Sequence, residues 1–290
     1  MSASPDRDTA RATSVPRRDL PNFLVVGAMR SGTTSLIRYL RSHPQVFVAP
    51  HKELHYFDFN FGEGTDWYRN NFVDAGDHVA VGEGTPNYMY IEEAPPRIAA
   101  LIPDARLVAI LRDPVERAYS HYWHNRAVGR EELDFASALA AEADRIASDD
   151  PHARAYWSYV DRGRYLGQLE AICRLFPRES LHVLLFDDLR DEPARAYRSV
   201  CRFLGVDEGH VPPELGSAVN SFVAFRSRRI RSLTRRLPKG AGRVLGRLNA
   251  RDESYPAMPA DVRANLHERL HGDNAALAAW LGRDLSPWQR

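Results

Sequence analysis

A glycine-rich stretch at residues 25–35, VVGAMRSGTTS, combines the residue types that bind phosphate-like groups. Gly27 and Gly32 have the spacing of the nucleotide-binding loop G-x-x-x-x-G-K-[ST] and follow an apolar run. In such a turn the backbone N–H groups converge on an anion, and the helix that follows adds its positive end. Thr33 stands where that loop has lysine, and Arg30 supplies the cation. The pattern predicts an anion-binding loop with a displaced positive charge, or, more simply, a tight strand-to-helix turn.

A second stretch, LVAILRDPVERAYSHYWH at residues 107–124, ends an apolar run and begins a helix. Asp113 suits the N-cap of that helix, and Pro114 suits its first position. Arg112 then leaves the strand at the edge of the sheet, and Ser120 follows about two turns into the helix. The pair is suited to holding a second anion. In the alternative interpretation the motif is only a helix cap and Ser120 only fills space.

A third stretch, HKELHYFD at residues 51–58, contains candidate general bases. The Glu53 carboxylate can accept the proton of a hydroxyl group, which typically gives a rate factor of about 10²–10⁴. His55 is the alternative base, and in an extended segment it lies on the same side as Glu53. Glu53 can also be half of a surface pair with Lys52. His51 and His55 have the spacing of a helical zinc pair, but a third ligand is not evident, and we predict no metal.

Five apolar runs of strand length alternate with helix-like stretches. The runs cover residues 21–28, 44–49, 77–84, 105–113 and 180–188, and the helix-like stretches cover 33–43, 95–102, 115–128, 135–148, 153–176, 193–204 and about 261–282. This alternation predicts a single α/β domain, a central parallel sheet flanked by helices, similar in outline to a P-loop kinase. Ligands of such sheets bind beyond the carboxyl ends of the strands. Residues 27–34, 83–88 and 112–113 are therefore expected along one rim.

The composition is that of an ordinary globular protein, with 290 residues and a formal net charge of +1. We expect a polar, flexible arm at residues 1–20 and one domain at residues 21–290. The arm has no apolar core, and no run approaches the roughly 18 apolar residues that span a bilayer. The two cysteines, Cys173 and Cys201, do not suggest a disulfide framework. A cytoplasmic setting is therefore expected.

The three motifs together resemble sulfotransferases that use 3′-phosphoadenosine-5′-phosphosulfate (PAPS). GAMRSGTTSL resembles the 5′-phosphosulfate loop of that family, and LVAILRDPVERAYSHYWH resembles its 3′-phosphate signature. KELHYFD is similar to the catalytic segment of the heparan sulfate 3-O- and N-sulfotransferase branch, in which the glutamate acts as base. The similarity continues through RGRYLGQLEAICRLFP, LLFDDLRDEP and LGRDLSPW, and so covers the chain from about residue 21.

The resemblance implies PAPS as co-substrate, the bisphosphate PAP as product, and no metal. Arg30 takes the place of the usual loop lysine, where it keeps the charge but cannot give up a proton. Arg112 and Ser120 fall on the 3′-phosphate positions. The implied acceptor is a hydroxyl, or less readily an amine, of a glycan, a glycolipid or a small-molecule metabolite, with Glu53 as base and His55 beside it. The remaining cradle positions are Ser31, Gly32, Thr33, Thr34 and Ser35.

Two stretches depart from the family or resist assignment. In GEGTPNYMY, Gly84 stands where the heparan-type enzymes have lysine, and Glu83 is either a second carboxylate near the acceptor or a strand-end residue. Residues 226–251 hold ten Lys or Arg and no acid. The resemblance implies a basic stretch here that closes over the nucleotide. A solvated basic helix and a membrane-surface contact are the alternatives.

Two other functions remain open at this stage. The first is a P-loop-like phosphotransferase, in which Asp187 would supply the acid that holds Mg²⁺, although the missing loop lysine argues against it. The second is a basic protein that uses residues 226–251 on anionic membranes or nucleic acid, although we expect no nucleic-acid partner. The sequence does not predict an oligomeric state.

Overall fold

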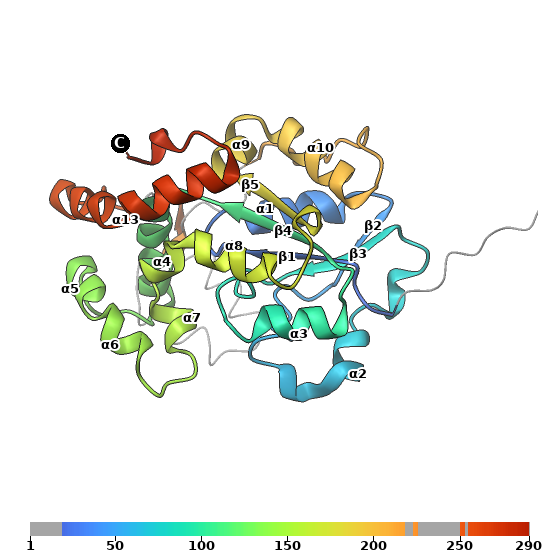
Figure 1. Ribbon diagram of the computed structural model, residues 1–290, viewed down its shortest axis with the longest axis horizontal. Coiled ribbons are helices and arrows are strands. Elements are labelled where there is room, and N and C mark those ends of the chain that lie inside the picture. Colours follow the sequence, from blue (N-terminus) through green and yellow to red (C-terminus); the bar gives the residue numbers. More distant parts are fainter. Residues whose placement is uncertain (1–18, 218–222, 226–249, 253–254, 290) are drawn as a thin grey trace, which may run out of the picture.

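The central sheet has five parallel strands in the order β2-β3-β1-β4-β5 (Figure 1). The computed structural model describes residues 19–217, 223–225, 250–252 and 255–289. The five strands fall inside the five predicted apolar runs: β1 Phe23–Gly27, β2 Val46–Val48, β3 Ala80–Gly84, β4 Arg106–Leu111 and β5 Leu181–Leu185. The prediction of a single α/β domain with a central parallel sheet is confirmed.

Helices connect the strands and cover both faces of the sheet (Figure 1). They are α1 Thr33–Arg41, α2 Gly64–Arg69, α3 Ala94–Leu101, α4 Pro114–Val128, α5 Phe135–Ala140, α6 Glu142–Ile146, α7 Ala153–Trp157, α8 Tyr165–Cys173, α9 Phe186–Asp191, α10 Pro193–Leu204 and α13 Ala260–Leu281. Short 3₁₀ turns lie at η1 Phe61–Glu63, η2 Val73–Ala75, η3 Asp161–Gly163, η4 Arg178–Ser180 and η5 Ser286–Gln289.

Three predicted elements differ from the structure. The stretch 135–148 is two helices, α5 and α6, and the stretch 153–176 is α7, η3 and α8. The second break has a visible cause, because Arg162 Nη2 lies 3.3 Å from the carbonyl oxygens of both Arg154 and Ala155 and so satisfies carbonyls in α7. The run 180–188 ends as a strand at Leu185, where α9 begins directly.

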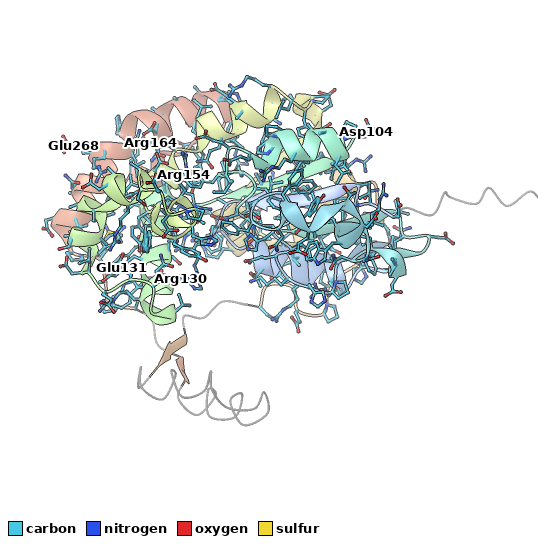
Figure 2. The ribbon with its side chains drawn as sticks, turned by 90° about the horizontal axis from the view of Figure 1, so that it is seen from below. Asp104, Arg130, Glu131, Arg154, Arg164 and Glu268 are labelled. Atoms are coloured by element: carbon cyan, nitrogen blue, oxygen red, sulfur yellow. The ribbon has the colours of Figure 1, made fainter. Side chains whose placement is uncertain are left out.

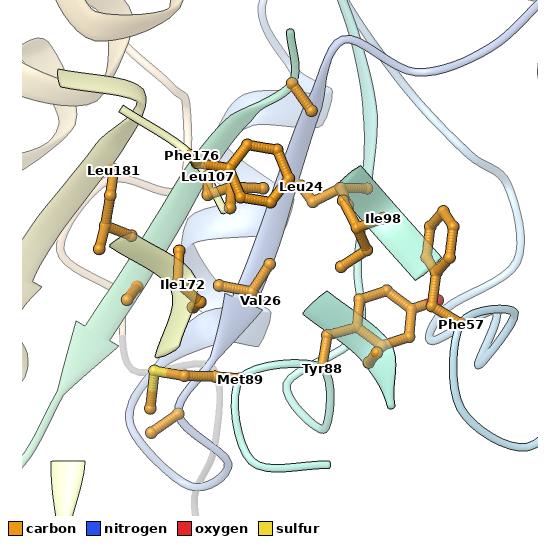
Figure 3. Packing of buried hydrophobic residues seen from close by; sticks show 14 of the residues in the cluster. Leu24, Val26, Phe57, Tyr88, Met89, Ile98, Leu107, Ile172, Phe176 and Leu181 are labelled. Atoms are coloured by element: carbon orange, nitrogen blue, oxygen red, sulfur yellow. The ribbon is translucent and has the colours of Figure 1, made fainter. Parts of the chain in front are cut away.

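The sheet separates two hydrophobic cores. Successive strand residues point to opposite faces, so Leu24 and Val26 of β1 join one cluster while Phe23 and Val25 join the other. The first cluster packs β1 and β4 against α3, α8 and the segment that contains Phe57 (Figure 3). The second cluster packs the opposite face against α1 and α10. Burial on both faces explains why the strands read as continuous apolar runs.

A third cluster joins α4, α5 and α13 beyond the carboxyl ends of the strands. Asp104, which precedes β4, and Arg130, which follows α4, lie toward opposite ends of the molecule (Figure 2). A short antiparallel pair, β6 Val223–Phe225 and β7 Ala250–Asp252, lies near α4. The Tyr119 hydroxyl on α4 donates to the carbonyl of Pro256 at 2.9 Å.

Some predictions fall on segments that the structure does not describe. The expected arm at residues 1–20 lies outside the described residues apart from its last two positions, and the basic stretch 226–251 lies outside them apart from residues 250 and 251. Both cysteines are free thiols. Within the described ranges, no helix has the length and apolar character needed to cross a bilayer.

Candidate active site

The first predicted loop joins the end of β1 to α1 and depends on two glycines. A Cβ on Gly27 would lie 2.8 Å from the Cβ of Met89, whose N–H donates to the Val26 carbonyl at 2.9 Å. Gly32 has φ +90°, and a Cβ there would approach the Phe186 ring to 3.0 Å. Both positions therefore require glycine, because a side chain would collide with neighbours or strain the backbone.

The amino end of α1 is uncapped and its donors are available. Gly32 is the N-cap and offers no side chain, and the first turn contains no acid. The first N–H groups of a helix have no intrahelical partner, so those of Thr33 and Thr34 point outward from the helix start. The Ser31 hydroxyl is fully buried and has no hydrogen-bond partner within the described part of the chain. Unsatisfied donors at a positive helix end fit an anionic ligand.

Two arginines from separate motifs meet beside this loop. The Arg30 Nε donates to the Ser120 hydroxyl at 3.1 Å, and Arg112 Nη1 lies 3.3 Å from the Arg30 carbonyl oxygen. The Arg112 guanidinium also lies over the Phe186 ring, 4.9 Å from its centroid. Burial and the neighbouring charge of Arg112 lower the pKa of Arg30. An anion placed between these like charges is favoured, because it removes their repulsion.

The second motif is both a helix cap and a rim arginine. The Asp113 carboxylate accepts from the Val115 N–H at 2.8 Å and so caps α4, as the sequence predicts. The Tyr165 hydroxyl donates to the Arg112 carbonyl at 2.8 Å, which fixes the backbone where β4 ends. Arg112 thereby leaves the sheet beside the glycine loop, and Ser120 on α4 faces Arg30.

The third motif brings Glu53 and His55 together, but not through an extended backbone. Both residues have positive φ, 56° for Glu53 and 52° for His55, so the segment is not extended and the alternation of an extended strand does not apply to it. The backbone is shaped by hydrogen bonds such as that from the His55 N–H to the Thr85 hydroxyl at 3.3 Å. Glu53 Oε2 lies 3.8 Å from His55 Nε2, and Glu53 Oε1 lies 3.1 Å from Lys52 Nζ. The two candidate bases form one ion pair.

The charges of this ion pair decide which group can accept a proton. Burial alone lowers the pKa of His55, but the hydrogen bond to Asp58 and the negative charge of Glu53 raise it to about 9. Burial raises the pKa of Glu53, but His55 and Lys52 outweigh burial and lower it. At neutral pH His55 is therefore an imidazolium and Glu53 a carboxylate. Of these two side chains, only the Glu53 carboxylate can therefore accept a proton at neutral pH.

Sequence inspection missed a chain of polar groups behind His55. His55 Nδ1 contacts Asp58 Oδ2 at 2.8 Å, and the Asn87 Nδ2 donates to the same carboxylate at 3.0 Å. The Asn87 Oδ1 in turn accepts from Arg162 Nη1 at 2.8 Å. The Asp58 side chain is 1% exposed, so this series of hydrogen-bonded side chains extends from Glu53 into the protein interior. Asp58 lies three residues after His55 in the quoted motif, and that spacing was the available signal.

A second histidine, His124, also lies near the site and was missed. It follows Ser120 by four residues on α4, and therefore lies on the same face of that helix. Burial and the charges of Arg30 and Arg130 lower the pKa of His124 to about 4, so it is neutral at physiological pH. The helical spacing from Ser120 was the signal that could have identified it.

Glu83 and Asp187, two further acids that the sequence singles out, are both held by neighbouring groups. Glu83 on β3 is 1% exposed, burial raises its pKa to about 7, and it accepts from the Thr85 hydroxyl at 2.7 Å. It lies near the end of β3, and its Oε1 has no hydrogen-bond partner among the described residues, so its role as a second carboxylate or as a strand-end residue stays a prediction. Asp187 lies on α9, where it pairs with Arg190 at 2.8 Å and accepts from Trp288 Nε1 at 3.3 Å. That engagement opposes the use of Asp187 as a magnesium ligand in a P-loop phosphotransferase.

One cavity connects the anion-binding loop with the carboxylate. It has a volume of about 230 Å³ and is lined by Thr33 and Thr34 of the loop and by Glu53. The structure thus brings together residues from three motifs, which follow the carboxyl ends of β1, β2 and β4, along one rim of the sheet. Among the described residues, no group of three or more His, Cys, Asp or Glu side chains is placed to hold a metal ion.

The fold and the site define a class of protein. A parallel sheet, a glycine loop before an uncapped helix, two arginines and a nearby ionised carboxylate form an α/β protein that binds a phosphorylated ligand beside a general base. The chain matches the family described as "Sulfotransferase domain" over residues 20–229, and it belongs to that family. This membership confirms the family that the sequence motifs resemble.

Similar proteins agree with this assignment. A sulfotransferase from Alicyclobacillus acidocaldarius has a crystal structure with a TM-score of 0.72 and 30% identity, covering 93% of this chain and 99% of the other. Human bifunctional heparan sulfate N-deacetylase/N-sulfotransferase 3 is 30% identical over 288 residues, which is 93% of this chain and 31% of that protein. Mouse heparan sulfate glucosamine 3-O-sulfotransferase 3A1 is 32% identical over 189 residues, which is 65% of this chain and 47% of that protein. The chain therefore spans about a third to a half of these two relatives.

Proposed function

We propose that this protein transfers a sulfuryl group from PAPS to a hydroxyl group of a carbohydrate or small-molecule acceptor, with Glu53 as general base. The observation on which this rests is that the ionised Glu53 carboxylate and the loop threonines line the same 230 Å³ cavity. A base must lie next to the group being transferred, and this arrangement meets that requirement. The similarity to enzymes named for heparan sulfate supports a carbohydrate acceptor.

The hydrogen-bond donors and positive charges of the loop suit PAPS as the sulfuryl donor. The uncapped α1, the unpartnered Ser31 hydroxyl and Arg30 suit a 5′-phosphosulfate. Arg112 and Ser120 suit the 3′-phosphate. When bound, the donor supplies an activated sulfuryl group on a phosphate leaving group. The guanidinium of Arg30 stabilises the negative charge that develops there, and it acts only electrostatically because it stays protonated.

Glu53 supplies the proton transfer. Its carboxylate removes the acceptor hydroxyl proton as the new S–O bond forms, while the S–O bond to the 5′-phosphate breaks and its electron pair leaves with PAP. His55, held protonated by Asp58 and Glu53, orients the carboxylate and lowers its pKa. A lower pKa makes Glu53 a weaker base but keeps it ionised at neutral pH.

Glu53→Gln tests this role. The amide keeps the size of the side chain but cannot accept the proton, so turnover should fall by about 10²–10⁴. Transfer of labelled sulfate from PAPS to a panel of saccharides and phenols measures this. PAP affinity should stay near that of the native protein, because its proposed contacts lie elsewhere.

The control is His55→Ala, which should lose less turnover than Glu53→Gln. A larger loss in His55→Ala would make His55 the base. Thermal shift with PAP and with ATP and Mg²⁺ separates donor classes, since a ligand at 100 times its Kd stabilises by about 2.7 kcal/mol. Stabilisation by ATP alone would contradict the proposed donor.

A further inference from the structure

The cavity that contains Glu53 is lined by more positive charge than the transfer reaction uses. Thr34, Ile37, Arg38 and Arg41 recur at helical spacing and form one face of α1, and this face is one wall of the cavity. The 51–53 segment forms the opposite wall and contributes two more basic side chains, His51 and Lys52.

The cavity lies on the acceptor side of the phosphate-binding loop. Arg112 and Ser120, the groups that suit the 3′-phosphate, follow β4, which pairs with β1 on one side. The cavity adjoins the ends of β2 and β3, on the other side of β1, through Val48 and Gly84. The nucleotide therefore extends away from the cavity, and the Arg38 and Arg41 side chains face whatever approaches Glu53.

The basic side chains that line the cavity differ in how strongly they are bound to partners within the protein. Lys52 is paired with Glu53, whereas Arg41, among the described residues, donates to the backbone carbonyl of Ala49 at 3.0 Å. Arg38 pairs with Glu214 at 2.7 Å, but both side chains are about half exposed, at 51% and 53%. An exposed pair of this kind contributes only about 0–1 kcal/mol, so Arg38 can exchange Glu214 for another anion at little cost.

Gly84 keeps the cavity open. A Cβ at this position would lie 2.8 Å from Cδ1 of Ile37, which itself lines the cavity. Any side chain there would displace Ile37 or fill the space beside Glu53. The volume of about 230 Å³ is below the usual range for a whole drug-sized ligand, so it suits one compact group of a larger molecule.

We propose that Arg38 and Arg41 form a subsite for a carboxylate or sulfate-ester group of the acceptor, and that this subsite selects acceptors with an anion close to the reacting hydroxyl. The proposal rests on the proposed sulfuryl transfer and narrows its acceptor class. Arginine forks match both oxyanions geometrically. Ile37 and Val48 supply the apolar walls of the cavity beside these two arginines.

The test uses ligands that differ at one position. 4-Nitrophenyl β-D-glucoside, the corresponding glucuronide and the glucoside 6-sulfate share one sugar and one aglycone. Calorimetry measures their Kd for the full chain, with and without PAP. The native protein should bind one or both anionic glycosides at least about tenfold more tightly than the neutral glycoside. Preference for the glucuronide alone identifies a carboxylate, and preference for the 6-sulfate alone identifies a sulfate ester.

Variants assign the preference to the subsite. Arg38→Gln with Arg41→Gln removes both charges but keeps an amide donor for the Ala49 carbonyl, and the anionic preference should disappear. Arg195→Gln is the matched control, since Arg195 is an exposed α10 arginine paired with Glu192 at 3.0 Å, and it should retain the preference. Glu214→Gln removes the anion that competes for Arg38 and should strengthen binding of the anionic glycosides, a gain that misfolding cannot imitate.

The outcomes separate the two proposals. No anionic preference in the native protein, or a preference that survives in the double variant, overturns the subsite. PAP binding is measured on the same samples. If PAP fails to bind, the proposed sulfuryl transfer fails, while the glycoside affinities still decide whether the cavity selects anions.

Discussion

His55 and His124 are two imidazoles near one carboxylate, and their surroundings drive their protonation in opposite directions. Asp58 and Glu53 raise the pKa of His55 to about 9, whereas burial and the charges of Arg30 and Arg130 lower that of His124 to about 4. At neutral pH one ring is a cation and the other is neutral. Groups that titrate far apart within one site can perform different tasks without exchanging protons.

The charge of His55 should appear in the pH dependence of stability. Its folded pKa, about 9, lies above the ordinary value of 6.5, so the folded chain holds this proton more tightly than the unfolded chain. The stabilisation is complete below about pH 6.5 and is lost as pH rises through 9. The difference in unfolding free energy between the native protein and His55→Gln should therefore shrink between pH 7 and 9.5, as measured by urea denaturation. A constant difference, or an NMR titration of His55 near 6.5, would contradict the assignment.

At the scale of elements, the Glu53 segment is positioned by groups from two distant connections. Asn87 lies between β3 and α3, Arg162 lies in η3, and together they hold Asp58 behind His55. Arg162 is 1% exposed as a residue, its guanidinium lies 4.2 Å from the Tyr90 ring centroid, and burial lowers its pKa to about 9. Asn87 is thus the neutral link between a buried carboxylate and a buried guanidinium.

Replacement of that link should be costly. Asn87→Leu leaves Asp58 without one donor and Arg162 without one acceptor, so the unfolding free energy should fall by about 2–4 kcal/mol. Chemical denaturation measures the loss, and NMR should show a changed pKa of His55. Asn71→Leu is the control, because within the described part of the chain the Asn71 side chain donates to nothing but the carbonyls of Trp67 and Tyr68. Equal losses in both variants would show that Asn87 has no special role.

The sequence predicts elements better than contacts between them. Strands buried on both faces read as uninterrupted apolar runs, so β1 and β4 were found from sequence alone. The break at residues 158–164 was missed because it depends on Arg162 bonding carbonyls of α7, which is a tertiary effect. In the site, Glu53 and Arg30 lie in recognisable motifs, whereas Asn87 joins Asp58 only after folding.

At the scale of the whole molecule, the glycine loop between β1 and α1 divides the rim of the sheet. Arg112, Ser120 and the Phe186 ring lie on the β4 side, and Glu53 with its cavity lies on the β3 side. In the proposed reaction the donor lies on one side of this loop and the acceptor on the other, and the two meet at the loop. The two faces of β1 are buried in separate cores, which holds the loop rigidly at the centre.

This division predicts separable effects of substitutions. Arg112→Ala should weaken PAP by at least about tenfold but weaken adenosine 5′-phosphosulfate, which lacks the 3′-phosphate, much less. Acceptor affinity measured by calorimetry should not change. Equal weakening of the two nucleotides would mean that Arg112 serves the loop through its contact with the Arg30 carbonyl instead.

The left-handed backbone at Glu53 also affects the stability of the folded protein. A left-handed φ of 56° suits glycine and strains other residues by about 1–2 kcal/mol. Glu53→Gly and Glu53→Ala both delete the carboxylate, yet the glycine variant should be the more stable by about 1 kcal/mol in denaturation. Equal stability would show that the turn is relaxed. On stability alone the turn favours glycine, so the stability difference between these two variants measures how much the left-handed backbone costs any residue with a side chain at this position.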